Sequence, residues 1–261
     1  MPYKRLRSGK TIETETASNL SSAAKKRIAS AVTKQNISLM NLSDEPGAAE
    51  EIKVCGYFIL RTSYDLYEYF AAVSGKYKLN PVKIELCAFI RELCEAIEPF
   101  AVKRGFAVVH TLRQKDVFVY TDAEKLCYSI GNLVLNAMEN THKGGRIRVS
   151  VSTTKKFVKI TVGDRGCGMD EETVLHCCEP FFSKKSENPE ETMGLGLTLA
   201  RHFASESGGR MTIHSEEEKG TAISLLLPIM ERENAGLAVE SPAAYTVRKY
   251  AGTLNMVFAE I

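Results

Sequence analysis

The sequence predicts an α+β protein in which an N-terminal antiparallel helical hairpin precedes an α/β sandwich, a mixed sheet with helices on one face. Three observations favour this class. Two helical patterns open the chain, pairs of period-two segments follow as adjacent hairpins, and amphipathic helices separate those segments. With 261 residues, 44% hydrophobic and 25% charged, the chain is long enough to bury one large core or two modest ones.

A helical hairpin accounts for most of the first 78 residues. We expect a flexible tail over residues 1–16 and helices at about 17–42 and 48–74, joined by the turn SDEPG at 43–47. Because a hairpin with one apolar face cannot bury that face alone, residues 17–78 are predicted to pair with a second copy in a dimeric four-helix bundle. The alternative is that the hairpin packs on the rest of its own chain.

A second domain, over residues 79–230, mixes strands and helices. VKIE, FAVVHTL and VFVYTD have strand character, and RIRVSVSTT with FVKITVGD forms a hairpin of period two. One helix follows VKIE and ends at Gly105, a second is opened by Asp122 as its N-cap, and a third covers 195–207. A last pair of strands closes the domain. The C-terminal extension, residues 231–261, has strand-like alternation and no role that the sequence assigns.

Composition and charge exclude several classes of protein. The formal net charge of +2 is too small to favour nucleic acid as a partner, and no apolar run approaches the roughly 20 residues of a membrane span. The basic N-terminus precedes no apolar segment typical of a secretory signal, so we expect a cytoplasmic protein. Seven cysteines without CxxC spacing favour reduced, buried thiols, and any metal would arrive with a ligand.

At two glycine pairs, we expect another group to come close to the main chain. Asp164 ends a strand, and Gly166 and Gly168 follow it in a turn that a Cβ would obstruct. Gly194 and Gly196 stand where a loop becomes the N-terminus of a helix. The backbone N–H groups and the dipole at such a terminus suit an anion such as phosphate.

Asn132 and Asn136 lie four residues apart on the long helix and so share one face. Burying neutral carboxamides on a face that should be apolar costs free energy of desolvation unless these groups bind something. Their oxygens suit Mg²⁺, which keeps several waters and bridges phosphates.

Taken together, the motifs of residues 79–230 resemble the ATP-binding domain of histidine protein kinases. These are Bergerat-fold ATPases, a group that includes DNA gyrase, the mismatch-repair ATPases and the large heat-shock chaperone. Five motifs in family order are far more specific than any one of them. They are the N box NLVLNA (132–137), the first glycine box DRGCG (164–168), the F box EPFF (179–182), the second glycine box GLGL (194–197), and the final hairpin EKGTAISLLLP (218–228).

The resemblance implies that the chain binds ATP and Mg²⁺. Asp164 would accept a hydrogen bond from the adenine amino group, Asn136 would ligate Mg²⁺, and Asn132 would face the phosphates. Residues 169–193 would form a lid over the nucleotide. The other expected contacts come from Gly166, Gly168, Lys184, Lys185, Gly194, Leu195, Gly196 and Thr221. A solvated charge run is the alternative for the two lysines, and a structural strand residue is the alternative for Thr221.

Two departures from the family leave the activity open. Glu139 stands where the N box usually continues with lysine, and no histidine precedes His110, so the hairpin lacks the phosphoacceptor; Asn19 falls near its position. No catalytic residue is assigned. One hypothesis is an ATP-dependent kinase of the histidine-kinase type, used in two-component signalling, that phosphorylates a residue in trans. A response regulator or another signalling protein would be its partner. The alternative is a pseudokinase scaffold that binds nucleotide and a regulator without phosphotransfer.

Overall fold

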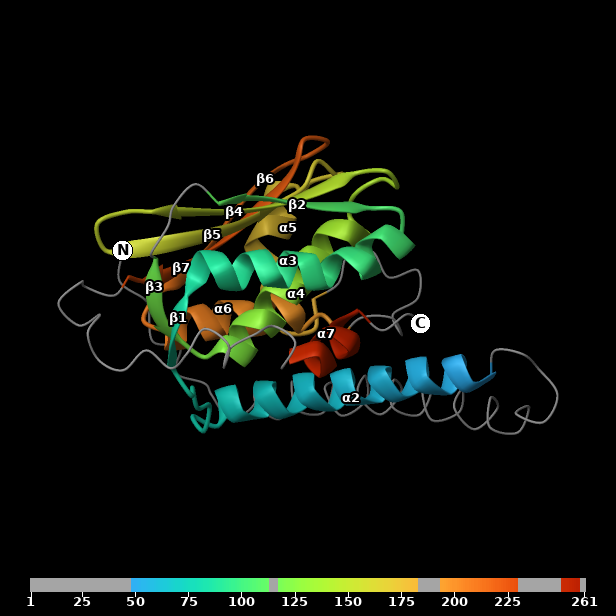
Figure 1. The fold of residues 1–261 in the computed structure, drawn as a ribbon, viewed down its shortest axis with the longest axis horizontal. Helices are drawn as coiled ribbons and strands as arrows, with labels where there is room; N and C mark the ends of the chain where they lie inside the picture. The colour runs from blue at the N-terminus through green and yellow to red at the C-terminus, as the bar shows by residue number, and fades with distance from the viewer. Residues whose placement is uncertain (1–47, 113–116, 183–192, 230–249, 259–261) are drawn as a thin grey trace.

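The computed structural model describes residues 48–112, 117–182, 193–229 and 250–258. They form three layers: a sheet, a layer of helices beneath it, and one long helix beneath those helices (Figure 1). In the described part of the chain, no helix is both long and apolar enough to cross a membrane.

The upper layer is a five-stranded mixed sheet of order β2-β4-β5-β7-β6. Its strands are β2 (Ala107–Leu112), β4 (Arg146–Thr153), β5 (Phe157–Gly163), β6 (Arg210–Glu216) and β7 (Gly220–Pro228). β2 runs parallel to β4, and the other neighbours are antiparallel. β1 (Val82–Glu85) and β3 (Phe118–Thr121) form a separate antiparallel pair. The predicted mixed sheet and its strand segments are confirmed.

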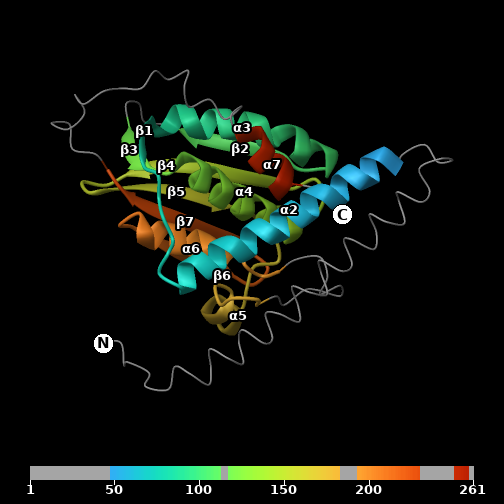
Figure 2. The same ribbon diagram turned by 90° about the horizontal axis from the view of Figure 1, so that it is seen from below.

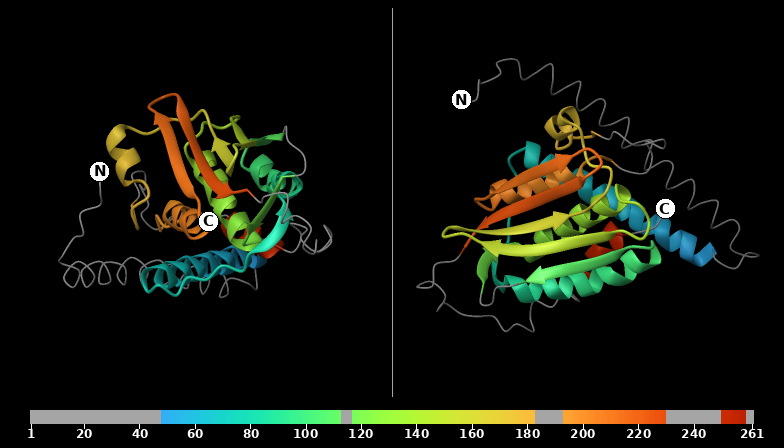
Figure 3. Two further views of the ribbon diagram at one scale, coloured as in Figure 1. Left: turned by 90° about the vertical axis from the view of Figure 1, so that its left-hand side faces the viewer. Right: turned by 90° about the horizontal axis from the view of Figure 1, so that it is seen from above.

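The sheet has one covered face and one open face. Ile147, Val149 and Val162 are buried against the helices, whereas Arg146 and Arg148 alternate with them and are exposed. Seen from above, the strands lie in front and the helices behind (Figure 3, right). This period-two pattern explains why helices cover only one face.

Three helices cover that face: α3 (Leu86–Lys103), α4 (Ala123–Glu139) and α6 (Gly196–Glu206). The carboxylate of Asp122 accepts a hydrogen bond from the Lys125 N–H at 3.0 Å, which confirms the predicted N-cap of α4. Glu85 caps α3 in the same way, because its carboxylate accepts from the N–H groups of Cys87 and Ala88. Both caps fix where a helix leaves its strand.

α2 (Ala48–Val73) matches the second predicted hairpin helix and crosses the lower side of the helical layer (Figure 2). It contacts α6 and the C-terminal helix and is hydrogen-bonded to α4, so this helix packs on its own chain. The first predicted hairpin helix and Asn19 lie outside the described residues. The pairing of the two helices, and with it the dimeric bundle, stays a prediction.

The strand-like expectation for the C-terminal extension was wrong where the extension is described. Residues Ala251–Val257 form a helix, α7. Leu254, Val257 and Phe258 are buried, and their spacing of three and four places them on one helical face. That face fits α4 where it carries Gly131: a Cβ there would lie 3.3 Å from the Val257 side chain. A small-residue groove on another helix therefore decides the conformation, which local alternation did not reveal.

The predicted lid segment contains a short helix, α5 (Glu171–His176), that the sequence reading did not anticipate. Asp170 caps it by accepting from the Thr173 N–H at 2.7 Å. Among the described cysteines, Cys87, Cys94, Cys127, Cys177 and Cys178 are buried free thiols, as expected, and Cys167 is half-buried.

Candidate functional site

Asp164 is fixed at the end of β5 by backbone donors. Its Oδ1 accepts hydrogen bonds from the N–H of Gly166 at 2.8 Å and of Thr221 at 3.2 Å. Burial raises the pKa of Asp164, and these two donors offset part of that rise. No described residue donates to Oδ2. One carboxylate oxygen thus orients the side chain, and the other can accept from a ligand.

The first glycine pair is required by backbone packing. A Cβ on Gly166 would lie 1.8 Å from the carbonyl oxygen of Asn140, and one on Gly168 would lie 2.0 Å from that of Glu216. Gly168 also has a φ of +65°. Between them, the Cys167 N–H donates to the Asn140 carbonyl at 3.0 Å. The loop after Asp164 is therefore fastened to the end of α4 and to the turn between β6 and β7.

The two asparagines of α4 differ in what their side chains do. Asn132 is 4% exposed; its Oδ1 accepts from Arg61 Nη2 at 3.1 Å and its Nδ2 donates to the Tyr128 carbonyl at 3.0 Å. Asn136 is half-buried, and the Nδ2 of Asn140 lies 3.4 Å from its Oδ1. The Asn136 oxygen keeps capacity for a further partner, whereas the Asn132 carboxamide is engaged within the protein.

The second glycine pair brings the N-terminus of α6 against α4. A Cβ on Gly196 would lie 3.2 Å from Asn132 Oδ1. Gly194 has a φ of +65°, and its carbonyl accepts from the Phe181 N–H at 3.1 Å. Leu195 is the N-cap of α6 and makes no side-chain hydrogen bond to the helix. The first N–H groups of α6 lack a side-chain cap, which suits an anion.

Thr221 supports Asp164 through its main chain. Besides the N–H bond to the carboxylate, its carbonyl accepts from the Asp164 N–H at 2.9 Å, and its hydroxyl lies 2.8 Å from that of Ser215. The side chain is 7% exposed. Thr221 therefore holds the carboxylate in place from the neighbouring strand.

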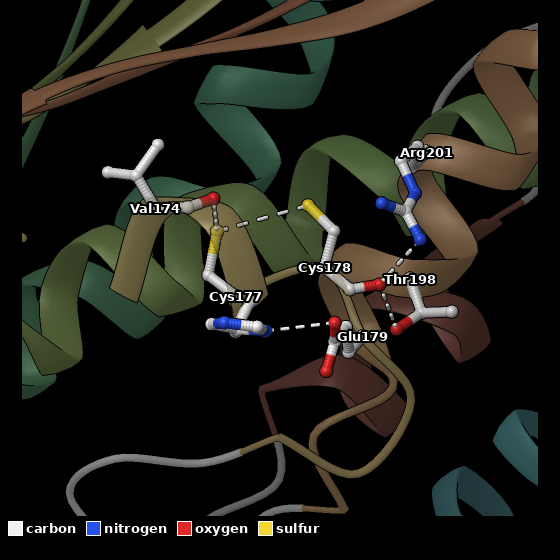
Figure 4. A network of polar contacts seen from close by, with 7 residues as sticks. Val174, Cys177, Cys178, Glu179, Thr198 and Arg201 are labelled. Carbon is white, nitrogen blue, oxygen red and sulfur yellow. Dashed lines mark hydrogen bonds and ion pairs between the residues drawn. The ribbon is translucent and has the colours of Figure 1, made fainter. Parts of the chain in front are cut away.

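The described part of the lid is anchored on α6 (Figure 4). The carbonyl of Cys178 accepts from Thr198 Oγ1 at 3.1 Å and from Arg201 Nη2 at 2.8 Å. The Sγ atoms of Cys177 and Cys178 are 4.0 Å apart. This contact lowers the pKa of the Cys177 thiol and, with burial, raises that of Cys178. Lys184 and Lys185 lie outside the described residues.

Comparison with known families decides what this site belongs to. Residues 121–231 match the family described as histidine kinase-, DNA gyrase B-, and HSP90-like ATPase. Residues 121–231 thus match an ATPase domain of this family. The match contains the N box, both glycine boxes and the F box, which confirms the family resemblance and the predicted fold class.

Individual relatives of the ATPase domain are sensor kinases. Sensor histidine kinase YvrG of Bacillus subtilis (strain 168) is 25% identical over 185 residues, which are 68% of this chain and 32% of that protein. The chain thus spans about a third of this relative. The catalytic domain of histidine kinase ThkA is 25% identical with a TM-score of 0.51, over 57% of this chain and 95% of that one. ThkA in complex with response regulator TrrA shares the fold, with a TM-score of 0.61 at 20% identity over 84% of this chain and 63% of that one.

A ladder of polar contacts joins α2 to the ATPase domain. The pairs are Arg61 with Asn132, Asp65 with Tyr128, and Glu68 with Lys125. Because the residue numbers rise along α2 while they fall along α4, the two helices are antiparallel. Burial raises the pKa of Tyr128, so its hydroxyl remains protonated and donates to the Asp65 carboxylate. The ring of Phe181, in the F box, also meets Tyr69 of α2 edge to face at 5.3 Å.

The α2 side of this ladder was missed by the sequence reading. Its signal is a polar stripe on α2, at spacings of four and three residues, inside an otherwise apolar helix. Asp65 and Glu68 are 4% and 7% exposed, which is rare for carboxylates unless they are paired. Their spacing could have indicated a second buried face on α2.

Proposed function

We propose that this chain binds ATP with Mg²⁺ and transfers the γ-phosphoryl group to a residue of a partner protein in two-component-type signalling. One observation carries the proposal. The loop that follows the fixed carboxylate of Asp164 is bonded to Asn140 at the end of α4, and the uncapped N-terminus of α6 packs on Asn132 of the same helix. The amino group of adenine would donate a hydrogen bond to the carboxylate, and a phosphate chain would accept hydrogen bonds from the N–H groups of the helix.

The residues expected at the base and phosphates keep distinct roles in the proposal. Asp164 accepts the adenine amino group through Oδ2, and Gly166 with Gly168 forms the adjoining backbone. Gly194, Leu195 and Gly196 receive the phosphates through main-chain N–H groups. Thr221 supports the carboxylate. Lys184 and Lys185 would approach the phosphates from the lid.

Asn136 is the residue that fits Mg²⁺. Its half-buried carboxamide has an oxygen with one long contact, and a single oxygen ligand is enough for an ion that keeps waters and binds phosphates. The ion would neutralise charge on the phosphates. The Asn132 oxygen already accepts a hydrogen bond from Arg61 on α2, so the contact between α2 and α4 is a candidate control point for nucleotide binding.

The phosphoacceptor is proposed to lie on another protein. The first 109 residues contain no histidine, so the hairpin segment offers no imidazole. A partner histidine, or a serine as in anti-sigma-factor kinases, would take the phosphoryl group. The ThkA complex makes a response regulator a reasonable partner to test. Catalysis would rest on positioning and charge neutralisation.

A pseudokinase that binds nucleotide and a regulator is the second candidate. It is favoured by Glu139, an exposed anion where the family has a cation, and by the engaged carboxamide of Asn132. Incubation with Mg²⁺ and γ-labelled ATP separates the two. The kinase proposal expects nucleotide binding and label on an added partner, with acid lability identifying phosphohistidine. Binding without transfer to any partner tested would favour the scaffold, and absence of binding would contradict both.

A further inference from the structure

A basic cleft opens on the uncovered face of the sheet, away from the helices. It has a volume of about 890 Å³ and lies at the end of the sheet where β4 begins and β5 ends. Its cationic lining is Lys143, Arg146, Arg148, Arg165 and Lys219, with His142 and His214 beside them. The only carboxylates in the lining are Asp164 and Glu216. Its volume lies within the range of small-molecule sites.

Strand register explains why the surface is hollow there. One line across four strands joins Arg148, Gly163, Ala222 and His214. The two middle residues carry almost no side chain, while the two ends carry long or cyclic basic ones. Three strand spacings separate those ends by about 14 Å. The glycine and alanine thus form a floor between two basic walls.

Most of the cations in the cleft have no acidic partner among the described residues. No described carboxylate pairs with Lys143, Arg146, Arg148 or Arg165, and all four are exposed. Only Lys219 has an acidic partner, the Glu216 side chain. Arg146 and Arg148 are two residues apart on one face of β4, so their Cβ atoms stand about 7 Å apart. Two guanidinium groups at that spacing can each bind a phosphate with paired hydrogen bonds.

We propose that this cleft binds a phosphorylated small molecule, with its phosphates on Arg146 and Arg148 and its body over Gly163 and Ala222. A protein surface is disfavoured, since the lining contains no Phe, Tyr or Leu anchor of the kind that forms interface cores. A nucleic-acid strand is disfavoured too. The cleft has no Phe, Tyr or Trp on which bases could stack, and the chain's net charge is only +2.

The cleft adjoins the ATP site proposed above but opens on the other face of the sheet. Along their strands, Arg148, Gly163 and Ala222 alternate with the buried Val149, Val162 and Ile223, so the two sets lie on opposite faces of the sheet. The cleft and the proposed ATP site share Asp164 and Thr221, where strands β5 and β7 reach their ends. The test must therefore report which face a ligand occupies.

Pyrophosphate without Mg²⁺ is the first probe, titrated into the full ¹⁵N-labelled chain. We expect amide shifts at Arg148, Gly163, Ala222 and His214. The double variant Arg146→Gln/Arg148→Gln should weaken the affinity at least about tenfold, because two charge-assisted contacts are lost. Lys155→Gln/Lys156→Gln is the matched control: it removes two exposed charges at the other end of the same strands and should change affinity less than about twofold.

Several outcomes would overturn the proposal. Shifts confined to residues 194–197 would place pyrophosphate at the helix N-terminus instead. An equal loss of pyrophosphate affinity in both double variants would show that the attraction is a nonspecific effect of charge. A glutamate-rich peptide that binds the cleft as tightly as pyrophosphate would replace the phosphorylated ligand with an acidic protein segment. Unchanged melting temperatures of the variants exclude unfolding as a cause, and none of these readouts depends on phosphotransfer.

Discussion

Arg61 on α2 donates a hydrogen bond from Nη2 to Oδ1 of Asn132 on α4, over 3.1 Å. Its Nη1 donates to the carbonyl of Val257, at the end of α7, over 3.0 Å. One guanidinium group thus joins the hairpin helix, the helix of the N box and the C-terminal helix. While this contact is made, the Asn132 oxygen is directed to α2 and not to a nucleotide.

Replacing Arg61 by alanine should free Asn132 and loosen the helices. We expect a stability loss of about 1–3 kcal/mol, because two carbonyl-type oxygens lose a charged donor. If Asn132 serves the phosphates, ATP should bind about fivefold more tightly, the equivalent of one net hydrogen bond. Chemical denaturation and calorimetric titration measure the two effects. Arg91→Ala, on the exposed side of α3, is the control. Unchanged ATP affinity would show that Asn132 does not contact the nucleotide.

Asp164→Asn should weaken ATP binding while leaving the fold intact. The amide keeps the Oδ1 that accepts from Gly166 and Thr221, but it replaces Oδ2 by a donor that faces another donor on adenine. We expect a loss of about 1–3 kcal/mol in binding free energy, measured by titration calorimetry. Glu85→Gln makes the same chemical change at the cap of α3 and should leave ATP binding unaltered. An equal loss in both variants would remove Asp164 from the site.

Burial of Asp164 also predicts a dependence of stability on pH. Its pKa is raised in the folded state, so between the unfolded and folded pKa values the native protein binds more protons. Stability contributed by this group is therefore present at low pH and falls as pH rises through that window. Denaturation at several values between about pH 3 and 6 should show a smaller fall for Asp164→Asn than for the parent. Parallel curves for the two proteins would contradict a raised pKa.

The sequence predicted those features that depend on neighbours along the chain. The period of two placed Val149 and Val162 toward the core, and Asp122 marked the start of α4 because a cap bonds within three residues. The glycine boxes were recognisable for the same reason. The contacts of these glycines could not be recognised, since the carbonyl groups that exclude a Cβ at Gly166 and Gly168 belong to the C-cap of α4 and to β6.

What sequence could not supply was pairing between distant elements. Tyr67 and Phe70 belong to the apolar pattern of α2, yet they are 71% and 52% exposed in the single chain. Asp65 and Glu68 are buried instead, because Tyr128 and Lys125 on α4 compensate them. Such compensation depends on a partner 57 or more residues away. Helix periodicity carries no information on it.

The C-terminal helix should be part of the stable domain. Phe258 is 2% exposed and stacks on Phe100 of α3 with ring centroids 5.4 Å apart. Phe258→Ala should cost about 3–5 kcal/mol of unfolding free energy, as for other buried aromatic truncations. Leu175→Ala, at a position on α5 that is 75% exposed, should cost less than about 0.5 kcal/mol. Urea denaturation measures the unfolding free energy of both variants. Similar small losses of this free energy in the two would mean that α7 detaches readily.

Dimerisation is expected to use the side of α2 that the ATPase domain leaves uncovered. Leu60, Tyr67, Phe70 and Val73 are 57%, 71%, 52% and 64% exposed, an apolar stripe that water disfavours. Light scattering should report about twice the 28.9 kDa chain mass.

Tyr67→Glu/Phe70→Glu should shift the protein to monomer, because four charges would face one another in a symmetric pair. Leu175→Glu, at a position on α5 that is 75% exposed, should leave the mass measured by light scattering unchanged. A parent protein that is monomeric at high concentration would rule out the bundle. The exposed stripe would then require a different partner, since the ladder from Arg61 to Glu68 already occupies the opposite side of α2.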